Sequence, residues 1–343
     1  MIFFRLETYD DLLKTKYLDC SDIRDMRGQY IQSKIVVNEK NTDFRGALLY
    51  GCYCGSDIQG AIIVNPKMSE EDVPIYVENT DIFRADLQDV DLRGANLKGS
   101  KFYECELQDA DLQGADLEKT EFASSNLKGA RLQGANLQGA TLTDINIQEA
   151  NLQEANLRGA NLRDANLEDA NLERADLQSA GLLSANFREA NLQDANLVGA
   201  SLNHGCFEGA NLVGANLEFA DLDETDFPSA ILKRANLKSV KSDSTYLDSA
   251  NLKNANAEGA TLYRAWLHSA DLTGANLSNA DFRHSKFKDA DLRGANLSNS
   301  DFRWASFKNA DMTGAKYNDK TNFEGSNIKE EQLDSMIFVE DEE

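Results

Sequence analysis

Large apolar side chains recur at every fifth residue along most of this chain. From Ile82 to Tyr317 this spacing holds for 48 consecutive repeats without an insertion or deletion. Calling the large apolar position i, Leu or Phe occupies it in 42 of the 48 repeats, and Ala occupies position i−2 in 35 of them. Neither an α-helix nor a flat strand has a period of five residues. The pattern therefore predicts that one large and one small apolar residue per repeat face a shared dry interior.

The other three positions of each repeat, i−1, i+1 and i+2, are mostly polar, as expected for an outer surface in water. Position i+2 is Gly, Asn or Asp in 26 of the 48 repeats. Because these residues accept a positive φ or hydrogen-bond their own backbone, we expect the chain to turn a corner once per repeat. Backbone groups then pair between stacked coils.

The phenylalanines indicate how many repeats make one coil. At position i they form two sets, each with one phase in a 20-residue period: Phe102, Phe122, Phe282 and Phe302, and Phe187, Phe207, Phe227, Phe287 and Phe307. Rings pack well over other rings, so four repeats per coil, with rings on two of four walls, is the simplest interpretation. At about 4.8 Å per strand, the repeats then form about 12 coils in a stack roughly 58 Å long.

This uninterrupted A(D/N)LxG register, as in ANLRGANLRDANLEDANLERADL at residues 155–177, resembles the pentapeptide-repeat family. The resemblance covers about 70 percent of the chain. It implies an all-β fold, a right-handed quadrilateral β-helix with positions i and i−2 inside. It also implies a bacterial and above all cyanobacterial type of protein, in a family that has no common catalytic residues to transfer.

Outside the regular repeats, both ends of the chain are expected to cover the exposed backbone of a β-helix. We expect one structural domain with an N-terminal cap at 1–43, irregular repeats at 44–76 with a loop at 65–74, the β-helix at 77–326, and a C-terminal capping helix with an acidic tail at 327–343. Ser326 or Asn327 is the expected cap of that helix.

Two repeats lack the large inward residue, at Ser242 and at Ala257. Two interpretations stay open for this part of the chain, residues 240–257. Neighbouring coils of a stacked array can carry a local irregularity, or the break is a bend with a functional role.

Charge narrows the class of partner. The chain has 35 Lys+Arg against 58 Asp+Glu, a net charge of −23. This charge disfavours direct binding to nucleic acid or to an anionic membrane and favours a protein partner. The chain contains no apolar run of about 18 residues, and its opening MIFFRLETYDD is unlike a secretory signal. We therefore expect a cytoplasmic protein.

Residues able to carry chemistry are few. The five cysteines, Cys20, Cys52, Cys54, Cys105 and Cys206, form no disulfide framework. Cys52 and Cys54 are interpreted as small residues in a turn, with metal ligation as the alternative. The histidines, His204, His268 and His284, fall at outward positions with no nucleophile or carboxylate arrangement that their spacing singles out. The sequence thus predicts no catalytic residue, no cofactor, no metal site and no enzyme.

The distribution of charge marks one region of the surface. Residues 81–228 hold 11 Lys+Arg and 27 Asp+Glu, whereas residues 229–310 hold 12 and 8. Because residues 20 apart stack, three outer ladders follow in the second region: Tyr246, Trp266 and Lys286; Tyr263, Arg283 and Arg303; and Arg264, His284 and Trp304. With His268 they form a candidate partner-binding patch, since exposed Trp, Tyr and Arg anchor interfaces. The alternative is an ordinary wall whose long side chains shield the backbone.

These observations predict a non-enzymatic scaffold or adaptor that presents its walls to a protein partner of unknown identity, with end-to-end pairing of two chains left open. The alternative is DNA mimicry, because relatives resembling quinolone-resistance pentapeptide proteins engage DNA gyrase through an acidic rod. Duplex DNA carries about 21 charges over the roughly 36 Å that residues 81–228 would span. Their net charge of −16 is comparable. Against mimicry, many such relatives project loops from the coils, which the unbroken register excludes here.

Overall fold

The computed structural model describes six short strands within the first 83 residues and then residues 87–122 and 124–340. By its backbone contacts the chain divides into two compact parts, unit 1 (Met1–Asn161) and unit 2 (Leu162–Glu343). Apart from those strands, the N-terminal cap and the irregular repeats with their loop at 65–74 lie outside the described residues, as does Cys52.

The strands of unit 1 all pair in parallel. They are β1 (Leu18–Asp19), β2 (Tyr30–Gln32), β3 (Ile35–Val36), β4 (Leu48–Tyr50), β5 (Tyr53–Cys54), β6 (Asp81–Phe83) and β7 (Lys101–Tyr103). β1 pairs with β3, β2 with β4, and β6 lies between β5 and β7. Asp81 of β6 lies opposite Lys101 of β7, which sets the coil length that the regular repeats keep.

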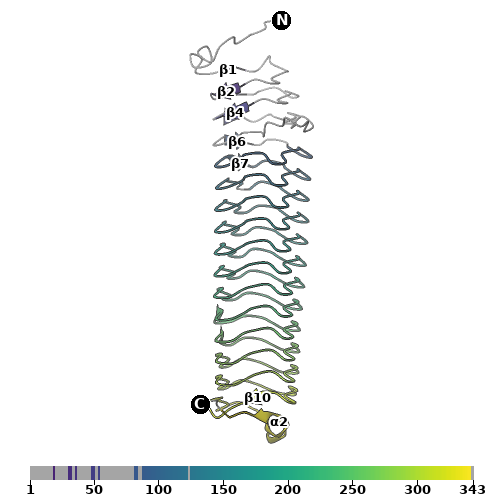
Figure 1. Cartoon of the computed structure of the whole chain (residues 1–343), viewed down its shortest axis with the longest axis vertical. Helices are drawn as coiled ribbons and strands as arrows, with labels where there is room; N and C mark the ends of the chain where they lie inside the picture. Colours follow the sequence, from purple (N-terminus) through teal and green to yellow (C-terminus); the bar gives the residue numbers. More distant parts are fainter. Residues whose placement is uncertain are drawn as a thin grey trace. The chain divides into compact units, whose positions relative to one another are not determined.

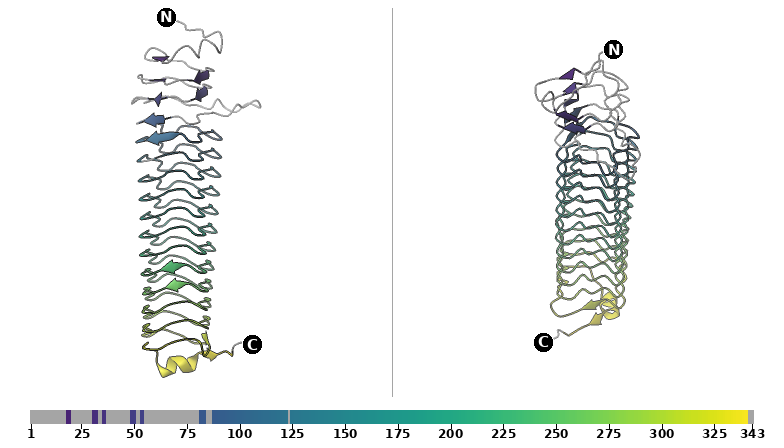
Figure 2. Two further views of the ribbon diagram at one scale, coloured as in Figure 1. Left: turned by 90° about the vertical axis from the view of Figure 1, so that its left-hand side faces the viewer. Right: turned by 45° about the horizontal axis from the view of Figure 1, so that its top comes forward.

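In each unit the regular repeats form coils that stack through parallel backbone pairing (Figures 1 and 2). Bridges join residues one coil apart, such as Asn96 with Asp116 in unit 1 and Asn216 with Asn236 in unit 2. These partners are 20 residues apart, so a coil holds four repeats, as the phenylalanine spacing predicts. The N–H at position i donates to the next coil, and the N–H at i−1 donates to the previous one.

Every repeat turns at position i+2. From residue 164 to residue 314, each i+2 residue except Ser244 has a positive φ. The N–H of the residue that follows donates to the carbonyl at position i, as in a type II turn. The predicted corner is therefore confirmed, and it includes residues that disfavour this conformation, such as Phe219 (φ 61°) and Trp304 (φ 57°). Each such residue costs on the order of 1 kcal/mol.

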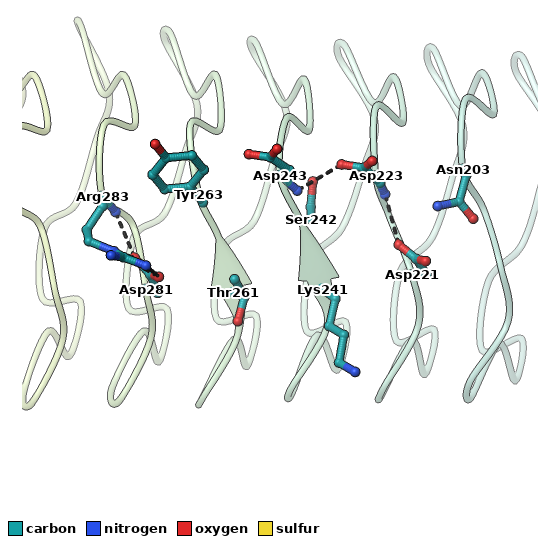
Figure 3. A pocket seen from close by; sticks show the side chains of 10 residues that line it. All are labelled: Asn203, Asp221, Asp223, Lys241, Ser242, Asp243, Thr261, Tyr263, Asp281 and Arg283. Carbon is teal, nitrogen blue, oxygen red and sulfur yellow. Dashed lines mark hydrogen bonds and ion pairs between the residues drawn. The ribbon is translucent and has the colours of Figure 1, made fainter.

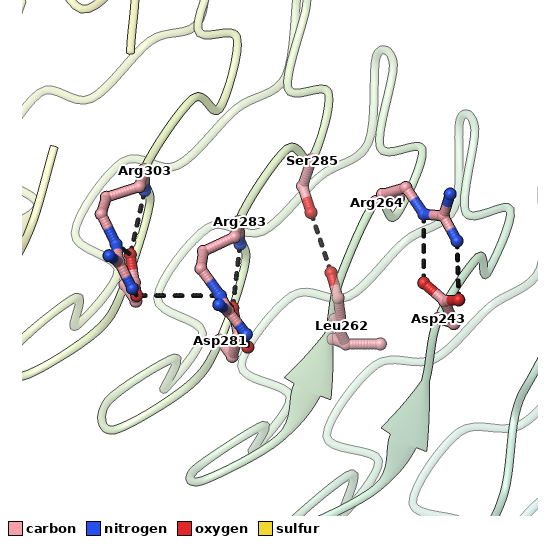
Figure 4. Close-up of polar contacts among 8 residues, drawn as sticks. Asp243, Leu262, Arg264, Asp281, Arg283, Ser285 and Arg303 are labelled. Carbon is pink, nitrogen blue, oxygen red and sulfur yellow. Dashed lines mark hydrogen bonds and ion pairs between the residues drawn. The ribbon is translucent and has the colours of Figure 1, made fainter. Parts of the chain in front are cut away.

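Leu, Phe and Ala side chains fill the interior. Among the described residues, the largest fully buried side chains are the nine phenylalanines that the 20-residue period singles out. Phe207 stacks between Phe187 and Phe227, with ring centroids 4.7 and 4.9 Å apart. Where Ser or Thr replaces Ala, its hydroxyl donates to a carbonyl of the previous coil, as Ser285 does to Leu262 at 2.8 Å (Figure 4). The interior therefore stays free of unpaired hydroxyls at these positions.

Asparagine at position i−1 explains the polar half of the repeat motif. The side-chain amide of Asn236 donates to Oδ1 of Asn216 at 2.9 Å. Oδ1 of Asn236 in turn accepts the backbone N–H of Lys238 at 3.2 Å. The asparagine side chain thus makes one hydrogen bond to the previous coil and a second one to the backbone of its own turn.

The C-terminal end of unit 2 departs from the regular register. After β8 (Lys241–Ser242) and β9 (Thr261–Leu262), it contains β10 (Lys316–Tyr317), α2 (Glu330–Ser335) and β11 (Ile337–Phe338). β10 pairs in parallel with β11. One extra residue enters after Tyr317, so Asp301 pairs with Asn322 and Phe323 stacks on Phe302 at 5.5 Å.

The predicted helix cap was wrong. The N-cap of α2 is Lys329. Asn327 precedes the helix, and its side-chain Oδ1 accepts the N–H of Phe307 at 2.6 Å, in place of the backbone carbonyl that a further coil would supply. Gln332 of α2 donates to the carbonyls of Phe307 and Ala310 at 3.0 and 2.9 Å. The helix thus covers the carbonyl of Ala310, which a further coil would otherwise pair, and adds a second hydrogen bond to the carbonyl of Phe307, which already accepts the N–H of Ala310.

Candidate functional site

Every fourth repeat of unit 2 lies on the same wall, so outer residues 20 apart are neighbours. Wall 1 has the inward residues 162, 182 and so on to 302. At the same interval, wall 2 has 167 to 307, wall 3 has 172 to 312, and wall 4 has 177 to 317. The ten residues of the predicted patch lie on walls 1 and 2 and on the corner between them. Their contacts form two clusters.

The wall 2 cluster consists of Tyr246, Trp266, His268 and Lys286. The Trp266 ring lies 5.8 Å from the Tyr246 ring and makes an edge contact with His268 at 5.6 Å. Nζ of Lys286 lies 3.3 Å from the centre of the Trp266 ring, a cation–π contact. All four side chains are partly exposed, so the cluster presents an indole that its neighbours hold in place.

The wall 1 cluster consists of Tyr263, Arg264, Arg283, His284, Arg303 and Trp304. Trp304 is 51% exposed, and its ring stacks on His284 with centroids 5.0 Å apart and planes 14° apart. Gly325 lies on the other side of the ring: a β-carbon there would come within 2.5 Å of Cδ1 of Trp304. The corner therefore holds an exposed indole between an imidazole and a glycine.

The arginines of the patch are paired with carboxylates (Figure 4). Arg264 binds Asp243 through two hydrogen bonds of 3.0 and 2.6 Å. Arg283 binds Asp281 at 2.6 Å, and Arg303 binds Asp301 at the same distance. The hydrogen bonds that the arginines donate to these carboxylates raise the pKa of each arginine above its usual value, so all three stay charged.

None of these three pairs was predicted from the sequence, although two of them carry a local signal. Asp281 and Arg283 occupy positions i−1 and i+1 of one repeat, and Asp301 and Arg303 repeat the arrangement one coil later. An Asp-x-Arg triplet on a repeat of this kind places both charges on one outer wall. The patch is thus a set of aromatic rings and ion pairs rather than a surface of free cations.

A shallow, open hollow of about 570 Å³ lies on wall 1 beside the wall 1 cluster (Figure 3). It is lined by Asn203, Asp221, Asp223, Lys241, Ser242, Asp243, Thr261, Tyr263, Asp281 and Arg283. Sequence reasoning marked Ser242 as a weak point but did not find the hollow.

The local backbone explains why the hollow forms at Ser242. The N–H of Ser244 donates to Oγ of Ser242 at 3.1 Å, and Ser244 lacks the positive φ of the other corners. At Ala257 the large side chain is missing too, yet the N–H of Ala260 still donates to the carbonyl of Ala257 at 3.1 Å. The missing leucine and the lost corner therefore coincide only at Ser242 within the fully described stretch 164–314.

The described residues contain neither a cluster of metal ligands nor a helix that could span a membrane. Within the described residues, no group of three or more His, Cys, Asp or Glu side chains could hold a metal ion. In the same part of the chain, no helix has both the length and the apolar character needed to cross a membrane. His204 lies at an exposed corner with Nδ1 3.2 Å from a carboxylate oxygen of Glu224.

Parallel coils of four five-residue repeats define a β-solenoid with a dry interior. The pentapeptide repeat region profile matches residues 85–162, and the pentapeptide repeats profile matches 182–218, 210–241, 244–279 and 275–314 in eight copies. The chain belongs to the pentapeptide repeat family, and its fold is the right-handed quadrilateral β-helix of that family. No curated protein sequence gives a significant match.

Several solved structures are similar to the chain. HetL, a pentapeptide repeat protein involved in heterocyst differentiation regulation in the cyanobacterium Nostoc sp. strain PCC 7120, is 30% identical over 70% of this chain and 88% of its own, with a TM-score of 0.22. Rfr23 from the cyanobacterium Cyanothece 51142 is 32% identical over 29% and 85%, with a TM-score of 0.26. QnrB1, a plasmid-mediated fluoroquinolone resistance protein, is 18% identical over 61% and 92%, with a TM-score of 0.43.

Proposed function

We propose that the protein is a non-enzymatic scaffold or adaptor that binds a partner protein through the wall 1 and wall 2 clusters of unit 2. The observation that carries this proposal is Trp304, an indole that is 51% exposed at a corner and is held between the His284 ring and Gly325. Members of the pentapeptide repeat family are in general structural or interaction proteins.

The geometry of both clusters favours binding. Indole rings that are already held by His284, Gly325 and Lys286 lose little conformational freedom when a partner covers them. Trp, Tyr and Arg are also the side chains that contribute most to binding energy at interfaces. The arginines keep their own carboxylates, so a partner need not neutralise them.

Paired alanine substitutions test this proposal. Trp266→Ala with Trp304→Ala should leave the circular dichroism spectrum unchanged and weaken capture of the partner about tenfold or more, because hot-spot tryptophans contribute about 2 kcal/mol or more. Phe219→Ser is the matched control, since Phe219 is 59% exposed on a comparable corner of wall 4. Affinity capture with quantitative mass spectrometry compares the three proteins. Equal recovery of the same partners by wild type and the double variant would exclude the clusters.

DNA mimicry is the second candidate, with DNA gyrase or another DNA-binding protein as the partner. It is supported by the 27 Asp+Glu against 11 Lys+Arg in residues 81–228. Mimicry predicts inhibition of gyrase supercoiling that weakens as salt rises, because surface charges are screened. A scaffold predicts no inhibition of gyrase supercoiling at low or at high salt.

Self-association and cellular location belong to the same proposal. End-to-end pairing through β11 is supported by Ile337 and Phe338, which are 50% and 53% exposed. Sedimentation should then show a dimer that Phe338→Asp converts to a monomer. A cytoplasmic location, about 12 coils and a one-domain organisation complete the proposal.

A further inference from the structure

Two carboxylates of the hollow on wall 1 form no ion pair. Among the described residues, Asp221 and Asp223 accept hydrogen bonds only from backbone N–H groups, those of Asp223 at 3.3 Å and of Asp243 at 2.9 Å. Neither forms an ion pair with a lysine or arginine of these residues, in contrast to Asp243 and Asp281, which bind Arg264 and Arg283. The charge of Arg264 acts on Asp223 at longer range, so both carboxylates remain able to pair with an incoming cation.

The coil that supplies these carboxylates is acidic beyond the hollow itself. Its sequence from 221 to 227 is DLDETDF. Burial, together with the nearby charge of Glu208, raises the pKa of Asp226. A negative field of this kind at the surface attracts a cationic group.

The floor of the hollow offers a hydrogen bond as well. Ser242 is only 5% exposed, and its Oγ accepts the N–H of Ser244. The Ser242 hydroxyl proton has no acceptor among the described residues. A backbone carbonyl of a bound segment could accept that proton, so the floor suits a peptide better than a simple cation.

We propose that this hollow receives a lysine or arginine side chain from a basic segment of the partner protein. The ammonium or guanidinium group would pair with Asp221 and Asp223, and Ser242 would donate to a carbonyl of the segment. This rests on the proposed function, because it names the chemistry of the partner that the adjoining wall 1 cluster contacts. The occupant is a protein segment and not a free small molecule, since the hollow is open to solvent and cannot enclose one.

One cation of the protein competes for this position. Lys241 lines the hollow and forms no ion pair with the described residues, so its positive charge repels an incoming cation. Arg283 lines the hollow too, but Asp281 and Asp301 neutralise it. Removing the charge of Lys241 should therefore strengthen binding, which a purely structural role of the hollow would not produce.

Fluorescence anisotropy with a defined peptide tests the inference. The probe is a fluorescein-labelled glycine–serine peptide carrying three arginines, and its control replaces each arginine with citrulline, which has the same shape and no charge. Asp221→Asn with Asp223→Asn removes the two carboxylates but keeps the oxygens that accept the backbone N–H groups. Asp169→Asn with Asp194→Asn is the matched control, because it makes the same charge change at exposed corners of unit 2.

We expect the hollow variant to raise the dissociation constant of the arginine peptide about tenfold at about 50 mM salt. The control variant should change it less than about twofold, Lys241→Gln should lower it, and the citrulline peptide should not bind. Equal weakening by the two aspartate variants, or equal binding of the citrulline peptide, would overturn the inference.

Two further outcomes would assign the hollow to another occupant and so overturn the inference. Competition by free arginine that is as strong, per side chain, as competition by the unlabelled peptide would indicate a small-molecule site. A dimer of the wild type that the hollow variant dissociates would indicate a second copy, through the exposed Lys233, Arg234 and Lys253 of wall 3. Loss of peptide binding is independent of partner capture by the tryptophan variants, so the hollow can fail while the proposed function stands.

Discussion

The stacked phenylalanines of wall 2 allow a measurement of what the ring ladder contributes. Phe207 has a ring on each side, with planes 7° from Phe187 and 23° from Phe227, whereas Phe187 stacks on Phe207 alone among the described residues. Phe207→Leu keeps the aliphatic packing that leucine provides elsewhere at position i but removes two ring pairs. At about 0.5–1.5 kcal/mol per pair, it should lower the free energy of unfolding by about 1–3 kcal/mol.

Phe187→Leu is the matched control because it removes one pair from an equally buried site, at about 0.5–1.5 kcal/mol. The double variant should cost less than the sum of the single variants by about the same amount, since the two share one ring pair. Urea unfolding followed by circular dichroism measures all four proteins. Equal losses at the two positions, or a strictly additive double variant, would refute the idea that ring-on-ring stacking sets the phase of the coil.

Three smaller changes test other parts of unit 2. Gln332→Ala removes three hydrogen bonds, two to the last regular coil and one from the N–H of Lys329, and should lower the free energy of unfolding by about 1.5–4.5 kcal/mol, measured by thermal unfolding. Burial, together with the charge of Glu208, raises the pKa of Asp226 in the folded state. Its ionisation therefore costs stability as the pH rises above 3.8, and the full cost applies above the raised pKa. Asp226→Asn should therefore stabilise at pH 7 and not at a pH below 3.8, the ordinary pKa of aspartate. Gly325→Ala should displace the Trp304 ring, because the new β-carbon would lie 2.5 Å from its Cδ1, and should shift the fluorescence of Trp304 to the red. The spectrum is recorded in a Trp266→Phe background, in which Trp304 is the only tryptophan.

The sequence was enough to predict the coil because each repeat solves the same packing problem. A leucine at i and an alanine at i−2 fix which groups face inward, and the fivefold spacing carries that choice along the chain. The 20-residue period of the phenylalanines then predicts four repeats per coil. The stack of Phe187, Phe207 and Phe227 confirms this length. Local rules were sufficient here because each neighbour in space lies a fixed 20 residues away.

The same rules fail where one residue breaks the register. The extra residue after Tyr317 changes the partner of Asp301, and the pentad pattern alone does not say whether Asn322 or Thr321 takes that place. The helix cap was missed for a related reason: Asn327 had a backbone N–H in the last coil to bind, which a local capping rule does not consider. Capping preferences describe helices with free ends, whereas α2 lies over a sheet edge.

Ser242 and Ala257 together show what turns a packing defect into a candidate site. Both lose the large inward side chain that contributes about 1.5–3 kcal/mol of transfer free energy. Ala257 remains 1% exposed with a regular turn, so loss of volume alone leaves the wall closed. At Ser242 the hydroxyl draws in the N–H of Ser244, and the corner loses its positive φ. The hollow thus depends on a polar inward residue that competes with the next coil for a backbone donor.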